Sequence, residues 1–284
     1  MAEHAALIHA RELASLIGAP QLLLLDCRHE LGQPQWGALA YAQGHIPGAV
    51  FASLDGDLSS PVRPGTGRHP LPAPGDFART LGRWGYTPQT RVVAYDQGPG
   101  AYAARLWWML RAVGHRAVQV LDGGLAAWLA ADGKLDTTTP AITPRQVAPR
   151  DFAGVLTSAE VEQALAARRI TLVDARGVDR FAGQNESIDP VPGHVPGAIN
   201  HPFTGNLDAA QRLLPPTELA ARWAGEVRLA HEAPIVAMCG SGVTACHNLL
   251  ALELAGYGQG RLYAGSYSEW IADPRRPVAT GVES

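Results

Sequence analysis

The chain has 284 residues, of which 46% are hydrophobic and 17% are charged, and its formal net charge is −3. This length suits two domains with hydrophobic cores of their own, while the scattered Lys and Arg argue against a nucleic-acid binder, which needs a concentrated basic face. No apolar stretch reaches membrane-spanning length, the first 18 residues lack the apolar core of a signal peptide, and three cysteines are too few for a disulfide framework, so we expect a cytoplasmic α/β protein.

The first half of the chain alternates short apolar runs with helical patterns. Residues 22–26 (LLLLD) and 92–95 (VVAY) have the character of buried parallel strands, and a glycine-rich turn follows the second run. Apolar residues at helical spacing over 101–114 end in a glycine, which predicts a helix that stops there. A further strand and turn are predicted over 118–124. Strand, helix and strand with short connections predict a parallel sheet with helices on both faces.

The second half repeats this order after a segment rich in Thr and Pro at 134–149. Four blocks match: 22–28 with 170–176, GHIPGA at 44–49 with GHVPGA at 193–198, the run from Arg91 with that from Pro234, and Gly114 and Trp128 with Gly256 and Trp270. We therefore predict an N-terminal domain at 1–136, a linker at 137–150 and a C-terminal domain of the same fold at 151–284.

The repeat also separates residues that serve the fold from residues that carry chemistry. Residues common to both halves are interpreted as structural: Asp26 and Arg28 with Asp174 and Arg176, and His45 with His194 in the two GHxPGA segments. The histidines are expected to be hydrogen-bonded core or turn residues. No spacing typical of a zinc site occurs among the cysteines and histidines, so we predict no metal and no cofactor.

The halves differ just after the strand run from Arg91 and its match from Pro234. Asp96 follows the first of these runs, and Cys239 follows the second. A thiol at the C-terminal end of a parallel strand lies where α/β folds bind ligands, and the following helix start favours a sulfur anion. Gly240 and Gly242 let the backbone curl around that sulfur. Cys239 is therefore predicted to be the nucleophile, rather than a buried structural cysteine, and the first half to be non-catalytic.

The loop CGSGVTA at 239–245 resembles the active-site loop of 3-mercaptopyruvate sulfurtransferases, which are tandem-domain members of the rhodanese superfamily. The resemblance covers nearly the whole chain and includes AARLWWMLRAVGH at 103–115, DARGVDRF at 174–181 and GSYSEW at 265–270. It implies an α/β fold of two tandem rhodanese-like domains, of which only the second is catalytic.

The resemblance also implies a reaction. The thiolate of Cys239 takes sulfur from 3-mercaptopyruvate, releases pyruvate and becomes a persulfide, from which an acceptor thiol, cyanide or a thioredoxin-like protein removes the sulfur. The loop positions expected to bind the substrate and its sulfur are Gly240, Gly242, Val243 and Thr244. Ser241 is expected to bond the thiolate or relay a proton, unless it is only a polar loop residue, while Thr244 could instead cap or pack the helix start.

A carboxylate donor needs a cation. Arg180 is the candidate, because the first half has Gly32 at the matching position and a guanidinium holds a carboxylate bidentately. The second arginine typical of the family is missing before GHVPG, which leaves the donor open; Arg68 could supply the charge. His69 and Asp55 fall where the family places a histidine and an acid that face the catalytic serine.

Three other functions stay open at this point. A thiosulfate sulfurtransferase would use the same chemistry, although the loop GSGV offers no cation for a dianionic donor. A cysteine phosphatase needs an arginine six residues after the cysteine, where this chain has Ala245. A sulfur carrier or regulatory module would take up sulfur without turnover. Of the other cysteines, Cys246 is expected two turns into the following helix and packed in the core, and Cys27 is expected to be buried.

Overall fold

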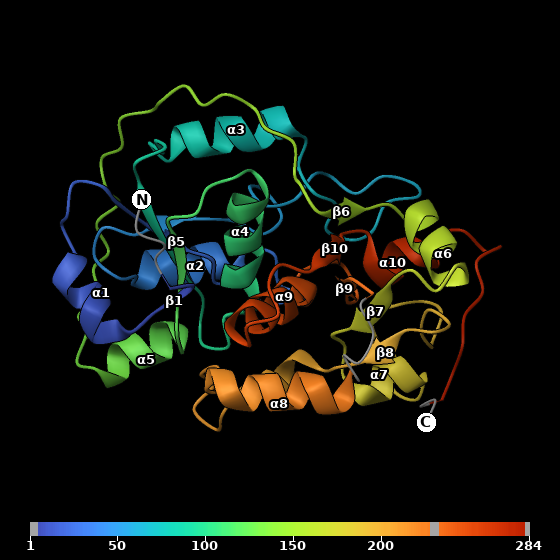
Figure 1. The fold of residues 1–284 in the computed structure, drawn as a ribbon. Helices are drawn as coiled ribbons and strands as arrows, with labels where there is room; N and C mark the ends of the chain where they lie inside the picture. Colours follow the sequence, from blue (N-terminus) through green and yellow to red (C-terminus); the bar gives the residue numbers. More distant parts are fainter. Residues whose placement is uncertain (1–4, 228–232, 282–284) are drawn as a thin grey trace. The chain divides into compact units, whose positions relative to one another are not determined.

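The computed structural model describes residues 5–227 and 233–281 and divides the chain into two compact units (Figure 1). The N-terminal unit comprises the described residues of 1–60, 71–153 and 209–213, and the C-terminal unit those of 61–70, 154–208 and 214–284. Short segments of each half therefore belong to the other unit. Among the described residues, no helix combines the length and apolar character needed to cross a membrane.

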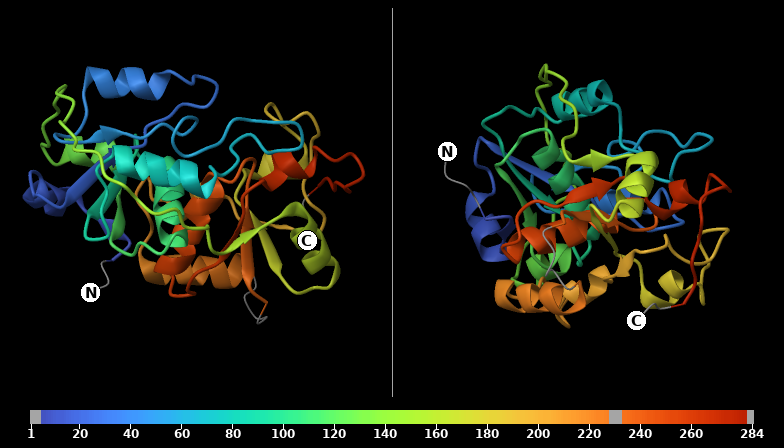
Figure 2. Two further views of the ribbon diagram at one scale, coloured as in Figure 1. Left: turned by 90° about the horizontal axis from the view of Figure 1, so that it is seen from above. Right: turned by 45° about the vertical axis from the view of Figure 1, so that its right-hand side comes forward.

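The N-terminal unit is built on a five-stranded parallel sheet in the order β1-β5-β4-β2-β3. Its elements are β1 (Leu7–Ile8), α1 (Ala10–Leu16), β2 (Leu22–Asp26), α2 (Trp36–Gln43), β3 (Val50–Phe51), α3 (Pro74–Arg83), β4 (Arg91–Tyr95), α4 (Ala101–Ala112), β5 (Val118–Leu121) and α5 (Gly124–Ala130). Gly114 follows α4 with a φ of +89°, as a helix-terminating glycine does. The predicted linker, 137–150, belongs to this unit and forms no helix or strand (Figure 2).

The C-terminal unit repeats the sheet in the order β6-β10-β9-β7-β8, again with every pairing parallel. Its elements are β6 (Val155–Leu156), α6 (Ser158–Ala166), β7 (Thr171–Asp174), α7 (Val178–Ala182), β8 (Ile199–Asn200), η1 (Phe203–Asn206), α8 (Pro216–Glu226), β9 (Ile235–Met238), α9 (Thr244–Leu254), β10 (Arg261–Tyr263) and α10 (Ser266–Trp270). Each strand has its equivalent in the other unit, so the predicted repeat of a parallel α/β fold is confirmed.

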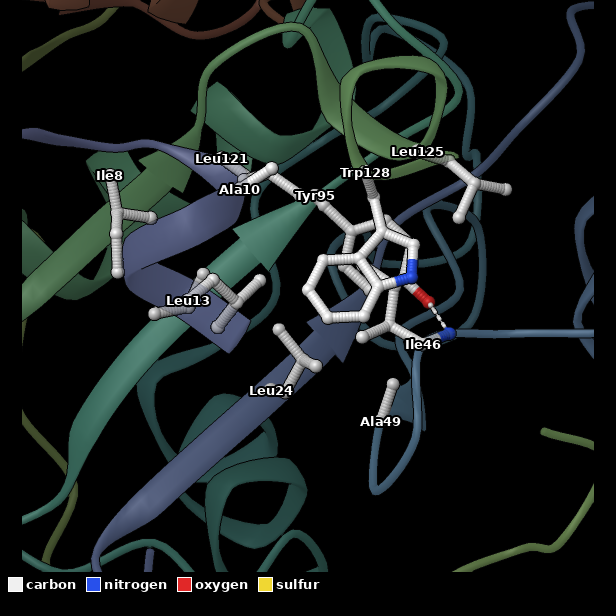
Figure 3. Packing of buried hydrophobic residues seen from close by; sticks show 11 residues of the cluster. Ile8, Ala10, Leu13, Leu24, Ile46, Ala49, Tyr95, Leu121, Leu125 and Trp128 are labelled. Atoms are coloured by element: carbon white, nitrogen blue, oxygen red, sulfur yellow. Dashed lines mark hydrogen bonds between the residues drawn. The ribbon is translucent and has the colours of Figure 1, made fainter. Parts of the chain in front are cut away.

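Apolar side chains from strands and helices form one core in each unit. In the N-terminal unit Leu24 of β2 packs with Leu13 of α1 and Trp128 of α5 (Figure 3). Tyr95, at the end of β4, accepts a hydrogen bond from the Ile46 N–H at 3.2 Å and donates its own hydroxyl proton to a carboxylate at the end of β2. Strand ends are thereby tied to the GHIPGA loop.

The residues shared by the two halves make the same contacts in both. The guanidinium of Arg28 binds Asp26 and the carbonyl of Gly44 at 2.8 Å, and that of Arg176 binds Asp174 and the carbonyl of Gly193 at 2.9 Å. His45 and His194 are buried, stack on Tyr41 and Phe181, and bond to the carbonyls of the same residues. These contacts confirm that the shared residues hold strand ends and turns.

Asp96, which replaces the cysteine in the N-terminal unit, reveals what the loop after β4 does. Its buried carboxylate accepts N–H bonds from Gly98, Gly100, Tyr102 and, at 3.3 Å, Ala103. Burial raises the pKa of Asp96, while these four N–H groups act in the opposite direction by stabilising the anion. The turn at the start of α4 is thus a cradle for negative charge, filled by the chain's own carboxylate.

Candidate active site

Cys239 follows the last residue of β9 and lies at the entrance to α9, which begins at Thr244. Its sulfur accepts the backbone N–H of Gly242 at 3.1 Å, and the residue is 2% exposed. The equivalent loop of the N-terminal unit holds the Asp96 carboxylate in the same way. A backbone N–H near the start of a helix is thus placed to stabilise negative charge on the Cys239 sulfur.

Two glycines of this loop lie where an added Cβ would come close to other atoms. Gly242 has a φ of +78°, and a Cβ added to it would lie 2.3 Å from the carbonyl oxygen of Ala264. A Cβ on Gly240 would lie 2.7 Å from Nη2 of Arg68. The first glycine lets the loop close over the sulfur, and the second lets a guanidinium approach the backbone beside Cys239.

Replacing Gly242 with alanine is expected to reduce sulfur transfer about a hundredfold and to destabilise the fold by roughly 1–3 kcal/mol, because the left-handed backbone becomes strained and the Cβ strikes a carbonyl. Gly258→Ala is the matched control, since Gly258 has a φ of +76° but nothing within 4 Å of the added Cβ. Urea unfolding and steady-state rates check both variants. Equal rates for Gly242→Ala and the wild type would contradict this role for the loop.

The segment GSYSEW, residues 265–270, is hydrogen-bonded to the backbone of the catalytic loop. The Cys239 N–H donates to Oγ of Ser266 at 3.0 Å, and that hydroxyl donates to the carbonyl of Tyr263. The carbonyls of Cys239 and Gly240 accept the N–H groups of Tyr267 and Ser268. Ser266 was not among the predicted site residues; its motif carried the family resemblance, but the sequence contained no sign of this contact.

His69 and Ser241 meet in the C-terminal unit, because the segment Pro61–Pro70 belongs to it. Ser241 Oγ and His69 Nδ1 are joined by a 2.7 Å hydrogen bond, and both residues are buried. The segment is anchored just before His69, where the Arg68 N–H donates to Oγ of Ser268 at 3.1 Å. Gly67 permits this approach, since a Cβ there would lie 2.5 Å from the carbonyl of Gly265.

Arg68 and Arg180 both lie beside Gly240. The position of a Cβ on Gly240 is 2.7 Å from Nη2 of Arg68 and 3.6–3.7 Å from the two terminal nitrogens of Arg180. Nε of Arg180 donates to both oxygens of Glu186 at 3.0 Å. Asp189 accepts Nη2 of Arg180 at 2.8 Å and also pairs with Nη1 of Arg68.

Glu186 and Asp189 were not predicted as site residues, although they occupy the segment that lacks the family's second arginine. Their side chains are 2% and 1% exposed. Burial favours the neutral form of Glu186, but the N–H of Asp189 and the guanidinium of Arg180 outweigh it, so the pKa of Glu186 lies below its usual value. The sequence did contain a signal for them, namely acidic residues between Arg180 and the GHVPG segment.

The remaining predicted residues lie as follows. Val243 is the N-cap of α9, and its side chain makes no capping hydrogen bond. Thr244 is the first helical residue, so it does not cap the helix; its packing at the helix start and its role in substrate binding stay predictions. Cys246 lies in the first turn of α9, not two turns in, because the residues between Cys239 and Thr244 form a loop. Cys246 is buried and donates to the Gly242 carbonyl. Asp55 lies in an exposed turn of the N-terminal unit, and its role stays a prediction. Cys27 is buried, which raises its pKa.

Comparison with known proteins agrees with this geometry. The family model of the rhodanese-like domain matches residues 9–131 and 157–273. A Pseudomonas aeruginosa protein named "Probable 3-mercaptopyruvate sulfurtransferase" is 51% identical over 98% of this chain and 99% of its own, and another from that species, named "Thiosulfate sulfurtransferase", is 32% identical over 95% and 96%. The crystal structure of SseA from Escherichia coli, described as a 3-mercaptopyruvate sulfotransferase, superposes with a TM-score of 0.82 and 33% identity over 93% of this chain and 100% of that one. The chain belongs to the rhodanese family, with two rhodanese-like domains in tandem.

Proposed function

We propose that this protein is a sulfurtransferase that takes sulfur from 3-mercaptopyruvate and carries it as a persulfide on Cys239. One observation carries the proposal: the sulfur of Cys239 is held by the Gly242 N–H, while two guanidinium groups flank the adjacent Gly240. A sulfur nucleophile beside cations suits a donor that presents a carboxylate near its thiol. The relatives named for this activity support the same choice.

The donor carboxylate is assigned to Arg68 together with Arg180. An arginine can hold a carboxylate bidentately through two parallel N–H···O bonds. In Arg180 the acids Glu186 and Asp189 bind Nε and Nη2, which leaves Nη1 for a substrate. In Arg68 only Nη1 is paired with Asp189; its Nε has no hydrogen-bond partner among the described residues, and its Nη2 faces Gly240. Arg68 thus replaces the family's second arginine.

The first half-reaction follows from this arrangement. The Cys239 thiolate attacks the donor's sulfur, a sulfur–sulfur bond forms, and the donor's carbon–sulfur bond breaks. The electron pair of that bond passes to carbon, giving the enolate of pyruvate, which takes up a proton and leaves. In the second half-reaction an acceptor thiolate attacks the outer sulfur and regenerates the Cys239 thiolate.

Ser241 and His69 supply the proton path in this proposal. Their 2.7 Å hydrogen bond joins a hydroxyl of the catalytic loop to a buried imidazole. A histidine exchanges protons near neutral pH, so the pair can deliver the proton that the enolate carbon needs. Asp55 is proposed to assist His69, on the strength of the sequence resemblance alone.

The acceptor is proposed to be a thiol, cyanide or a thioredoxin-like protein, because each is thiophilic enough to remove the outer sulfur. A reducing compartment such as the cytoplasm suits the three cysteines, between which the structure shows no disulfide bond. The persulfide chemistry needs no cofactor.

Steady-state transfer from 3-mercaptopyruvate and from thiosulfate, side by side with a dithiol and with cyanide as acceptors, tests the donor assignment. We expect a higher kcat/KM for 3-mercaptopyruvate by at least about tenfold, since its single carboxylate can bind the guanidinium nitrogens that lie beside Gly240. A preference for thiosulfate would favour the second candidate function, to which the paired guanidinium groups also give some support. Sulfur uptake without turnover on either donor would favour a carrier.

A further inference from the structure

Asp189 stands between the two arginines that flank the catalytic loop. One carboxylate oxygen pairs with Nη1 of Arg68, and the other accepts Nη2 of Arg180 at 2.8 Å. The side chain is 1% exposed, whereas those of Arg68 and Arg180 are 29% and 23% exposed. Asp189 is thus a buried carboxylate that spans two cations whose other nitrogens reach toward Gly240.

The charges of this cluster cancel. Its guanidinium groups belong to Arg68, Arg176 and Arg180, and its carboxylates to Asp174, Glu186 and Asp189. Asp174 is held by Arg176, and Glu186 bonds Arg180 as well as the N–H groups of residues 188 and 189. Of these three carboxylates, Asp189 is the one that pairs with both arginines beside the catalytic loop.

We propose that Asp189 sets the charge of the donor that this site accepts, favouring a monoanion over a dianion. The inference rests on the proposed function, since it concerns the donor of that reaction. A bound monoanion leaves the cluster with one excess negative charge, and a dianion leaves it with two. The second charge would face the fixed Asp189 carboxylate across the arginines, in a partly buried setting where water screens poorly.

Asp189 is a positioning residue in this account, because it acts through Arg68 and Arg180 and does not touch the donor. Its carboxylate also fixes which nitrogen faces the catalytic loop, since it takes Nη1 of Arg68 and leaves Nη2 beside Gly240. A thiosulfate dianion would profit from a site with a net positive charge, and Asp189 removes that charge.

The test is the ratio of kcat/KM for 3-mercaptopyruvate to kcat/KM for thiosulfate in Asp189→Asn. The amide keeps the shape and one acceptor oxygen. We expect the ratio to fall about tenfold, through KM, because the loss of one negative charge favours the dianion thiosulfate more than the monoanion mercaptopyruvate. The control Asp179→Asn removes the same charge from an exposed position of α7 and should leave the ratio within about twofold. A general structural fault would lower both rates and leave the ratio unchanged, and that outcome would overturn the inference.

A measurement on the unaltered chain covers the case in which Asp189→Asn does not fold. Methanesulfonate and sulfate share a tetrahedral head and differ by one charge, and each can be tested as a competitive inhibitor against 3-mercaptopyruvate. The inference predicts that sulfate inhibits no better than methanesulfonate, whereas sulfate inhibition tighter by about tenfold would refute it. Absence of transfer from either donor would refute the proposed function itself, and a ratio that Asp189→Asn does not alter would refute only the inference.

Discussion

Cys239→Ser is expected to abolish sulfur transfer, with a loss of at least about a thousandfold in kcat for any donor and any acceptor. Serine keeps the size of the side chain and can still meet the Gly242 N–H, which now bonds the sulfur at 3.1 Å. A hydroxyl, however, is almost never ionised near neutral pH and cannot carry sulfane sulfur, so both half-reactions are lost. Steady-state assays with 3-mercaptopyruvate and cyanide measure the effect.

Cys246→Ser is the matched control, because both cysteines are buried and seven residues apart. The Cys246 thiol donates to the Gly242 carbonyl at 3.3 Å, and a serine hydroxyl can donate the same bond. We expect its kcat/KM to stay within about threefold of the wild type. If the loss of Cys246 were as damaging as the loss of Cys239, the assignment of a single nucleophile would be wrong.

Arg68→Ala has the second largest expected effect. It removes the guanidinium group whose Nη2 lies beside Gly240, and of the two ion pairs of the buried Asp189 it leaves the one with Arg180. A charge-assisted pair contributes about 1.5–3 kcal/mol, so KM for 3-mercaptopyruvate should rise roughly ten- to a hundredfold. The effect on kcat should be smaller, because Cys239 and its N–H donor are untouched.

Two further variants distinguish carboxylate binding by Arg68 from a general effect of removing a positive charge. Arg68→Lys should recover only part of the affinity, since an ammonium group cannot hold a carboxylate bidentately. Arg275→Ala removes an exposed arginine paired with Asp273 and should leave KM within about twofold. A normal KM in Arg68→Ala would show that Arg68 does not bind the donor and would return the carboxylate to Arg180.

Most of the fold could be predicted from the sequence, because the apolar patterns of its strands and helices occur in both halves of the chain. Residues 22–26 became β2, and the helical pattern of 101–114 became α4. Tryptophans at equivalent positions pack in both cores and donate to carbonyls six and seven residues later, Trp128 to Lys134 and Trp270 to Pro277. Buried strands and glycine-terminated helices are specified by residues that are close together in the sequence, so they can be predicted without a structure.

The candidate site could be predicted less completely, because its contacts join residues that are far apart in the sequence. Cys239 could be proposed as the nucleophile from the sequence, since it differs from Asp96 within an otherwise matched block. The pairing of His69 with Ser241 spans 172 positions, and it depends on a segment of the first half that belongs to the C-terminal unit. Glu186 and Asp189 could not be assigned from the sequence, because their burial against Arg180 and, for Asp189, against the distant Arg68 depends on the folded chain.

Intact mass measurement after mixing the protein with 3-mercaptopyruvate alone, without acceptor, tests the central claim most directly. The account predicts that the chain gains one sulfur atom, that peptide mapping locates it on Cys239, and that a thiol acceptor removes it. A chain that transfers sulfur without gaining it, or that gains it on Cys27 or Cys246, would contradict a persulfide at Cys239.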